Sequence, residues 1–178
     1  MKSSEKGYSL IELIFSISII AMASGAAGGA VFQILHNTER NSDQMTVVRQ
    51  VQNAGYWISS DARMAVSAAT TDNLTSPDFL VFSWTKWEDD GDPIYYSATY
   101  FFADNTSGVG TLKRRYWTST GANQTTTRIA QYIYYDPADA ANTSNASYQN
   151  SILTVTITAI INQTRESKEY KIKHRPDF

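Results

Sequence analysis

Cysteine is absent from the 178-residue chain, and only two histidines are present. The absence of cysteine excludes disulfides, thiolate metal sites and thiol nucleophiles, although it does not identify the compartment. The histidines, His36 and His174, lie far apart in the sequence, and no carboxylate pattern around them matches a zinc site. We therefore expect no cofactor.

Glycine-rich phosphate loops and nucleophile elbows are also missing. Gly108-Val109-Gly110 lacks the third glycine of a dinucleotide-binding loop and does not stand between a strand and a helix. No Gly-x-Ser-x-Gly elbow occurs. The formal net charge of −2 argues neither for nor against a polyanionic partner. These absences argue against an enzyme and favour a structural or binding role.

No charged residue occurs in the long stretch between Leu13 and Leu35. A helix over residues 8–35 spans about 42 Å, which is enough to cross a bilayer. The carboxylate of Glu12 costs about 2.5–3.5 kcal/mol or more in hydrocarbon, so it needs a partner or a function. Cleavage after Gly7 would supply a partner, because the new ammonium group of Tyr8 lies one helical turn from Glu12 or from the same carboxylate of a neighbouring chain.

The sequence Lys6-Gly7-Tyr8-Ser9-Leu10-Ile11-Glu12-Leu13 resembles the class III signal of type IV pilins and type II secretion pseudopilins. The resemblance implies that prepilin peptidase cuts between Gly7 and Tyr8 and then methylates the amine of Tyr8. It also implies that Glu12 pairs with the N-terminal amine of a neighbour during filament assembly. Residues 1–7 are then a leader peptide, and residues 8–35 form the transmembrane and filament-core half of an N-terminal helix.

Two other interpretations of the N-terminal segment stay open. An ordinary secretory signal peptide, with Lys2 and Lys6 as its basic region, would be cut after Ala23 and would release a secreted soluble protein. A plain uncleaved anchor would keep the lysine-rich end in the cytoplasm by the positive-inside rule. Both interpretations leave Glu12 without a reason to be there.

Three glycines, Gly25, Gly28 and Gly29, interrupt the apolar segment, and each costs a helix about 1 kcal/mol relative to alanine. Gly25 and Gly29 form a GxxxG pair, which lets a second helix approach closely. Alternatively, the glycines form a point that stretches, since helices of the pilin family lose helical structure near this depth in filaments. Ordinary tolerance of glycine in a membrane helix is the third interpretation.

Beyond Leu35 the sequence becomes more polar but keeps helical spacing. Residues 36–69 are predicted to continue the helix as an amphipathic half, with a possible bend at Gly55 and an end at residues 70–73. The predicted apolar stripe consists of Met45, Val48, Val51, Ile58, Ala62, Ala65 and Val66. The change of pattern indicates a membrane segment first and packing against a domain afterwards.

Residues 70–178 are predicted to form an extracytoplasmic β-sheet domain. The predicted strands are residues 79–84, 94–103, 111–117, 128–136, 151–161 and 167–174, with a loop at 137–150. In the fifth, Leu153, Val155, Ile157 and Ala159 share one face and Thr154, Thr156 and Thr158 share the other, which predicts one buried face. Short turns predict an antiparallel sheet, covered by the amphipathic half of the helix. The predicted fold class is therefore α+β, the arrangement of the pilin fold.

The downstream sequence resembles one subgroup of this family more closely. Residues 60–63, 84–87, 112–116 and 153–157 are similar to minor pseudopilins of the J class of type II secretion and to related minor pilins. The resemblance implies a structural subunit of a pseudopilus or type IV pilus that helps to start assembly at the filament tip. The implied partners are prepilin peptidase, other minor and major pilins or pseudopilins, the inner-membrane assembly platform and the lipid bilayer. The implied location is the inner membrane, crossed once with a cytoplasmic N-terminus, and then the filament.

Two polar clusters are candidate binding sites. Asp89, Asp90 and Asp92 offer oxygen ligands to Ca²⁺, but their spacing is not that of an EF-hand, and Asp-Gly is an ordinary turn signal. Residues 113–117, Lys-Arg-Arg-Tyr-Trp, mix cations and aromatic rings as nucleic-acid-binding surfaces do, although solvated cations on an exposed strand give the same pattern. A DNA-binding or adhesive minor pilin is therefore the alternative function, while nucleic acid is not the expected partner.

Overall fold

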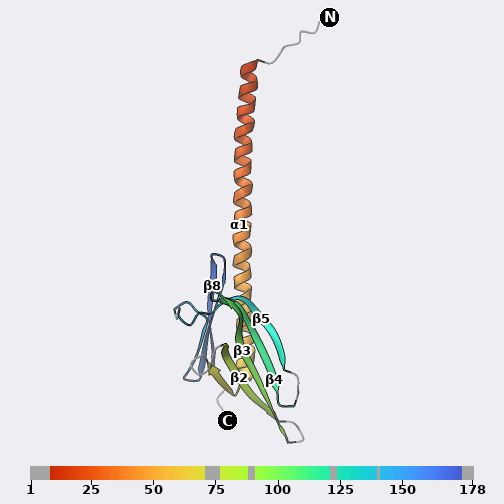
Figure 1. Ribbon diagram of the computed structural model, residues 1–178, viewed down its shortest axis with the longest axis vertical. Coiled ribbons are helices and arrows are strands. Elements are labelled where there is room, and N and C mark those ends of the chain that lie inside the picture. Colours follow the sequence, from red (N-terminus) through yellow and green to blue (C-terminus); the bar gives the residue numbers. More distant parts are fainter. Residues whose placement is uncertain (1–8, 71–76, 88–90, 121–123, 140, 174–178) are drawn as a thin grey trace. The chain divides into compact units, whose positions relative to one another are not determined.

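The computed structural model describes residues 9–70, 77–87, 91–120, 124–139 and 141–173. The chain divides into two compact units, Met1–Ser42 and Asp43–Phe178. Within the described residues, one helix, α1 (Leu10–Met64), contributes to both units, and eight strands follow it in the second unit (Figure 1). This is the predicted α+β fold, in which a long N-terminal helix packs on an antiparallel sheet.

The first unit contains the apolar half of α1. The carbonyl of Ser9, just before the helix, accepts hydrogen bonds from the backbone N–H groups of Glu12 and Leu13 at 3.0 and 3.2 Å. Every described residue of this unit is exposed. Its most apolar window has a mean hydropathy of 2.0, so by length and composition α1 is able to cross a membrane. The predicted helix start at Tyr8 lies outside the described residues.

Two hydroxyl side chains in this half of α1 are satisfied within the helix. Ser16 donates to the carbonyl of Glu12, and Ser18 donates to the carbonyl of Ile14, both at 2.8 Å. A hydroxyl that bonds to the carbonyl four residues earlier needs no water or partner chain. These serines therefore do not prevent the helix from lying in hydrocarbon.

The second half of α1 presents one buried stripe to the sheet. The stripe advances by three or four residues at each step and consists of Val47, Val51, Ala54, Ile58 and Ala62. Two predicted members are instead exposed, Met45 by 62% and Val66 by 52%. The prediction was wrong for Met45 because Val47 is the residue in phase with Val51, and it was wrong for Val66 because α1 ends at Met64.

α1 ends at Met64, and part of its predicted continuation is a strand, β1 (Ser67–Thr70). β1 pairs antiparallel with β2 (Asp78–Trp87), with Ala69 opposite Val81. The N–H of Val66 also donates to the carbonyl of Ser83 at 2.9 Å. The ladder with β2 thus overrides the helix preference of this alanine-containing segment. Residues 71–73, part of the predicted helix end, lie outside the described residues.

The eight strands form one antiparallel sheet in the order β1-β2-β3-β4-β5-β7-β6, with β8 paired to β7. All six predicted strands overlap strands of the structure. The remaining bounds are β3 (Pro93–Thr106), β4 (Val109–Thr118), β5 (Thr125–Tyr134), β6 (Asn145–Gln149), β7 (Ile152–Ile161) and β8 (Thr164–Lys173). β6 corrects the predicted loop at residues 137–150, because it pairs with β7 through positions such as Ala146 and Val155.

β7 holds the C-terminal part of the sheet together. β8 pairs with its whole length, whereas β6 pairs with its first half and β5 reaches it only where Ile133 lies opposite Ala159. The predicted apolar face of β7 is buried. Thr158, predicted on the exposed face, is also buried, because its N–H bonds to Ser144 Oγ and its hydroxyl contacts Ser167 Oγ, both at 3.0 Å.

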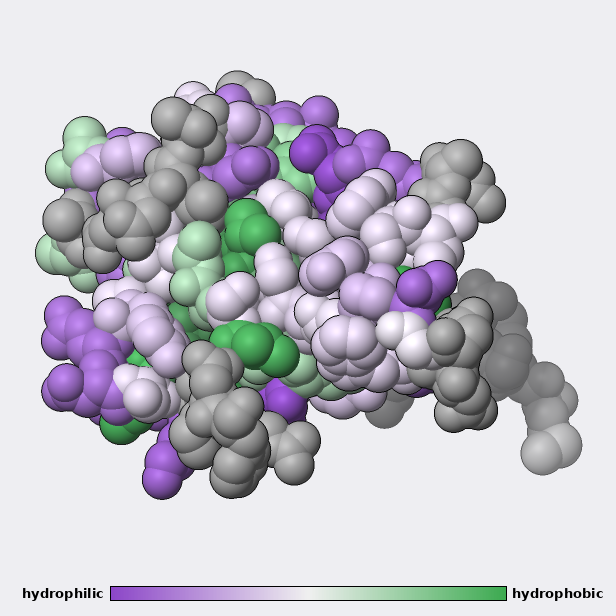
Figure 2. Space-filling view, turned by 90° about the horizontal axis from the view of Figure 1, so that it is seen from below, coloured by the Kyte–Doolittle hydropathy of each residue, from purple (hydrophilic) through white to green (hydrophobic). Residues whose placement is uncertain are grey.

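The core lies between the second half of α1 and the inner face of the sheet. Its largest buried side chains include Ile58 on α1, Phe82 on β2, Tyr100 on β3 and Leu112 on β4. The sheet curls around this part of the helix (Figure 1). From below, the visible face is mostly of intermediate or hydrophilic character, with small hydrophobic patches between (Figure 2). This core fixes which residues of each strand face α1.

Candidate functional site

Glu12 lies in the first turn of α1, where the helix dipole favours a negative charge. Its carboxylate forms no ion pair or hydrogen bond with any residue that the structure describes. Gly7 and Tyr8, the predicted cleavage and methylation sites, lie outside the described residues, as does the rest of the leader at 1–7. The pairing of Glu12 with an N-terminal amine therefore stays a prediction.

The glycines of the apolar half are not required by contacts within the chain. A Cβ atom added to Gly25, Gly28 or Gly29 would meet no heavy atom within 4 Å. α1 also continues through all three positions. Because the single chain supplies no contact that requires glycine, the close helix packing predicted for Gly25 and Gly29 stays a prediction.

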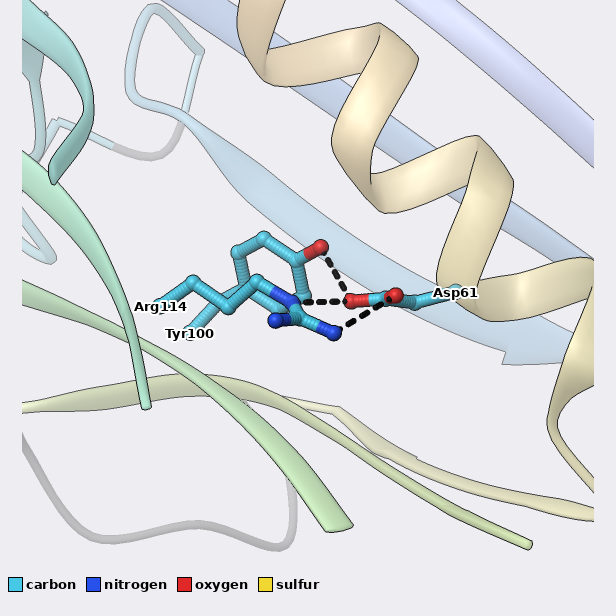
Figure 3. A network of polar contacts seen from close by, with 3 residues as sticks. All are labelled: Asp61, Tyr100 and Arg114. Atoms are coloured by element: carbon cyan, nitrogen blue, oxygen red, sulfur yellow. Dashed lines mark hydrogen bonds and ion pairs between the residues drawn. The ribbon is translucent and has the colours of Figure 1, made fainter. Parts of the chain in front are cut away.

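A polar network joins α1 to the sheet inside the second unit (Figure 3). Asp61 on α1 is 2% exposed. Arg114 donates to it through two bonds, Nε to Oδ2 at 2.7 Å and Nη2 to Oδ1 at 2.9 Å. Tyr100 donates its hydroxyl proton to Oδ2 at 2.5 Å. The paired bonds from one guanidinium make this a bidentate, charge-assisted interaction.

Helix spacing in α1 and strand pairing between β3 and β4 bring these three residues together. Asp61 lies three residues after Ile58, so it is on the same buried face of α1. Tyr100 on β3 lies directly opposite Arg114 on β4, so their side chains share the inner face of the sheet. A buried charge is costly unless it is paired and hydrogen-bonded. The network therefore favours one register of α1 against the sheet.

The protonation states of the network suit these bonds. Burial, followed by the carboxylate of Asp61, raises the pKa of the Tyr100 hydroxyl, which keeps it a neutral donor. Burial acts to lower the pKa of Arg114, but the hydrogen bonds and charge of Asp61 outweigh it and raise this pKa. The guanidinium also lies 5.4 Å from the Trp57 ring centroid and 4.8 Å from that of Tyr116.

The cationic and aromatic residues 113–117 lie on β4, which places their side chains on both faces of the sheet. Arg114 bonds to Asp61 on the inner face, whereas Lys113 pairs with Asp104 at 3.1 Å. Arg115 lies over the ring of Phe101, 4.7 Å from its centroid. The predicted cluster is therefore not a single surface, because alternate residues of a strand point to opposite faces.

The candidate calcium ligands fall mostly outside the described residues. Asp89 and Asp90 lie there, while Asp92 is described and exposed. Within the described part of the chain, no group of three or more histidines, aspartates or glutamates is arranged to hold a metal ion. The calcium alternative therefore stays a prediction.

Residues 2–28 match the family model described as the prokaryotic N-terminal methylation motif. The match supports a prepilin-type protein. It includes the predicted cleavage position at Gly7 and Tyr8 as well as Glu12, and so supports a type IV pilin-like substrate of prepilin peptidase. Together with the apolar half of α1, it also fits anchoring in the inner membrane and assembly with other pilins. No curated protein and no solved structure matches the chain.

The network of Asp61, Tyr100 and Arg114 was not predicted from the sequence, although one signal for it exists. Asp61 stands between Ile58 and Ala65, two members of the predicted apolar stripe. A carboxylate at such a position needs a buried cation or several hydrogen-bond donors. The sequence does not reveal that Arg114 is that cation, because the pairing depends on the register of distant strands.

Proposed function

We propose that this chain is a structural subunit, not an enzyme, and that it acts as a minor pilin or pseudopilin in a type II secretion pseudopilus or type IV pilus. The observation that carries the proposal is the methylation motif, which leads directly into an exposed helix without charge from Leu13 to Leu35. In this role, prepilin peptidase cuts between Gly7 and Tyr8, and the apolar half of α1 then packs among the helices of other subunits.

Glu12 gives this assembly a defined register. Its carboxylate has no partner among the described residues and stands at the start of the apolar helix. In a low-dielectric filament core, pairing with the amine of Tyr8 on an adjacent subunit offsets the cost of burying both charges. A subunit displaced along the filament axis would lose that pair, so the correct axial position is favoured.

The minor role at the filament tip rests on the J-class resemblance. Two of the resembling segments, 60–63 and 112–116, contain Asp61 and Arg114, which form the buried ion pair. A helix tied to its sheet in this way makes the second unit a stiff body, as a subunit that starts assembly needs. The DNA-binding or adhesive alternative predicts instead that the second unit has its own ligand.

The N-terminus of the mature protein tests the proposal. The full chain is expressed with and without a prepilin peptidase, extracted from membranes and analysed by intact and peptide mass spectrometry. We expect a chain that begins at Tyr8 and carries one methyl group, only when the peptidase is present. A chain that begins at Ser24 would identify an ordinary signal peptide, and an intact Met1 in the presence of active peptidase would identify a plain anchor.

A further inference from the structure

The outer face of β3, β4 and β5 carries cations and aromatic rings on the side away from α1. Arg114 and Tyr116 on β4 face inward, so the alternating residues of that strand face outward. On the neighbouring strands, Phe101 and Arg128 both lie opposite Lys113. We call this surface the outer patch, and its residues are Tyr95, Phe101, Lys113, Arg115, Trp117 and Arg128.

The described residues compensate only one of the three cations of the outer patch. Lys113 and Arg128 lie directly opposite each other on adjacent strands, an arrangement of like charges that destabilises a sheet. Asp104 neutralises Lys113, but Arg115 and Arg128 form no ion pair with any described residue. A carboxylate supplied by a partner would give these two guanidinium groups an ion pair that the described residues do not supply.

The aromatic residues of the outer patch add a contact area next to these charges. Two of them are large aromatic side chains that remain exposed, Trp117 by 43% and Tyr95 by 54%. Tryptophan, tyrosine and arginine dominate the binding energy of protein interfaces. Phe101 also contacts the Arg115 guanidinium, whose five N–H donors suit a carboxylate.

We propose that the outer patch is a docking surface for an acidic segment of a partner protein. Carboxylates of that segment pair with Arg115 and Arg128, and an apolar side chain on the far side of Arg115 from Arg128 packs on Trp117. A nucleic acid fits less well, because one of the three cations is already paired and the whole chain has a net charge of −2 and a pI of about 5.6. Binding through phosphates requires a larger positive field.

Fluorescence anisotropy with the full chain in neutral detergent tests this proposal. The probe is a short labelled peptide of glutamate and leucine, and its counterpart has glutamine in place of every glutamate. We expect the glutamate peptide to bind at least about tenfold more tightly than the glutamine peptide. The double variant Arg115→Gln/Arg128→Gln should lose about tenfold in affinity, and Trp117→Ala should also weaken binding.

The matched control is Lys173→Gln, which removes an exposed strand cation on β8 and should leave the affinity unchanged. The double variant should stay folded, because neither guanidinium forms an ion pair with a described residue. The proposal is overturned if the glutamate peptide does not bind, or if Lys173→Gln weakens binding equally. It is also overturned if an oligothymidylate of equal charge binds more tightly, or if the patch variants abolish self-association instead, which would make a second copy the occupant.

Because the outer patch contains no residue of the apolar half of α1, this outcome is independent of the filament proposal. A chain cleaved between Gly7 and Tyr8 can fail to bind the glutamate peptide, and an uncleaved chain can bind it.

Discussion

The ring of Tyr170 fills the space that a side chain at Gly55 would occupy. A Cβ atom added to Gly55 would overlap atoms of that ring, and the Tyr170 hydroxyl donates to the carbonyl of Val51 at 3.0 Å. Gly55 therefore marks the close approach of β8 to α1. α1 continues through this glycine to Met64, and the bend predicted there stays a prediction.

Replacing Gly55 with alanine should destabilise the protein, although alanine is the better helix former by about 1 kcal/mol. The added methyl group collides with Tyr170, and overpacking of this kind costs about 1–3 kcal/mol. Urea unfolding of the full chain in detergent measures the effect. Gly28→Ala is the matched control, because a Cβ there meets nothing within 4 Å and no loss is expected. A Gly55→Ala protein as stable as the original would contradict the contact.

Removing one member of the buried ion pair should cost more than removing both. Asp61→Ala leaves the Arg114 guanidinium without its carboxylate, and breaking a buried pair in this way costs about 3–5 kcal/mol. The double variant Asp61→Leu/Arg114→Met leaves no orphaned charge and should lose less. The matched control is Lys113→Met, because Lys113 neighbours Arg114 on β4 and is more exposed than it. This variant should change the free energy of unfolding by less than about 1 kcal/mol. Equal losses in the single and double variants would refute this account.

Tyr100 should make the fold sensitive to alkaline pH. Burial and Asp61 raise its pKa in the folded chain, whereas in the unfolded chain it ionises near its ordinary pKa of about 10. The folded state thus retains a proton that the unfolded state loses. Its contribution to stability is complete below about pH 10 and decreases above it by up to about 1.4 kcal/mol per pH unit.

Urea unfolding of the original chain and of Tyr100→Phe, between about pH 8 and about pH 12, measures this contribution. Tyr100→Phe should be less stable at neutral pH, because Asp61 loses a donor, and should show a shallower alkaline decrease. Tyr56→Phe, at a position 70% exposed, should keep the original slope. A Tyr100→Phe slope identical to that of the original chain would show that other groups cause the alkaline loss.

Glu12→Ala should prevent incorporation into filaments. The substitution removes the carboxylate that, in the proposed assembly, pairs with the amine of Tyr8 on a neighbour, so the correct axial position is no longer favoured. Immunogold electron microscopy of sheared filaments measures incorporation. Glu39→Ala is the matched control, because Glu39 is an exposed acidic residue on the same helix beyond the apolar stretch. Normal incorporation of Glu12→Ala would refute the assigned role.

The sequence predicted the elements whose pattern is local. The apolar stretch and the three- and four-residue spacing predicted α1, and alternation from Leu153 to Ala159 predicted the buried face of β7. β1 and β6 were missed because their residues are mostly alanine, serine, threonine and asparagine, which carry no alternating apolar signal. Their strand structure depends on pairing with β2 and β7, which no local pattern reveals.

The backbone irregularity in β5 also could not be predicted from the sequence. Tyr132 has a φ of 59°, a conformation that aromatic residues rarely adopt, at a register shift between β4 and β5. The N–H of the preceding residue, Gln131, donates to the side chain of Gln50 on α1 at 2.8 Å. A bulge held by a distant helix depends on tertiary contacts, so the sequence around Tyr132 gives no sign of it.

The position of β7 has a consequence for the order in which the protein folds. The hydrogen bond from Tyr170 to Val51 joins residues that are 119 positions apart, and β5, β6 and β8 all meet on β7. Contacts so distant in sequence form slowly, because the intervening chain must lose conformational entropy first. The apolar stripe of α1 is therefore synthesised well before the strands that bury it, which leaves the nascent second unit most vulnerable to aggregation and proteolysis until the β7–β8 hairpin docks.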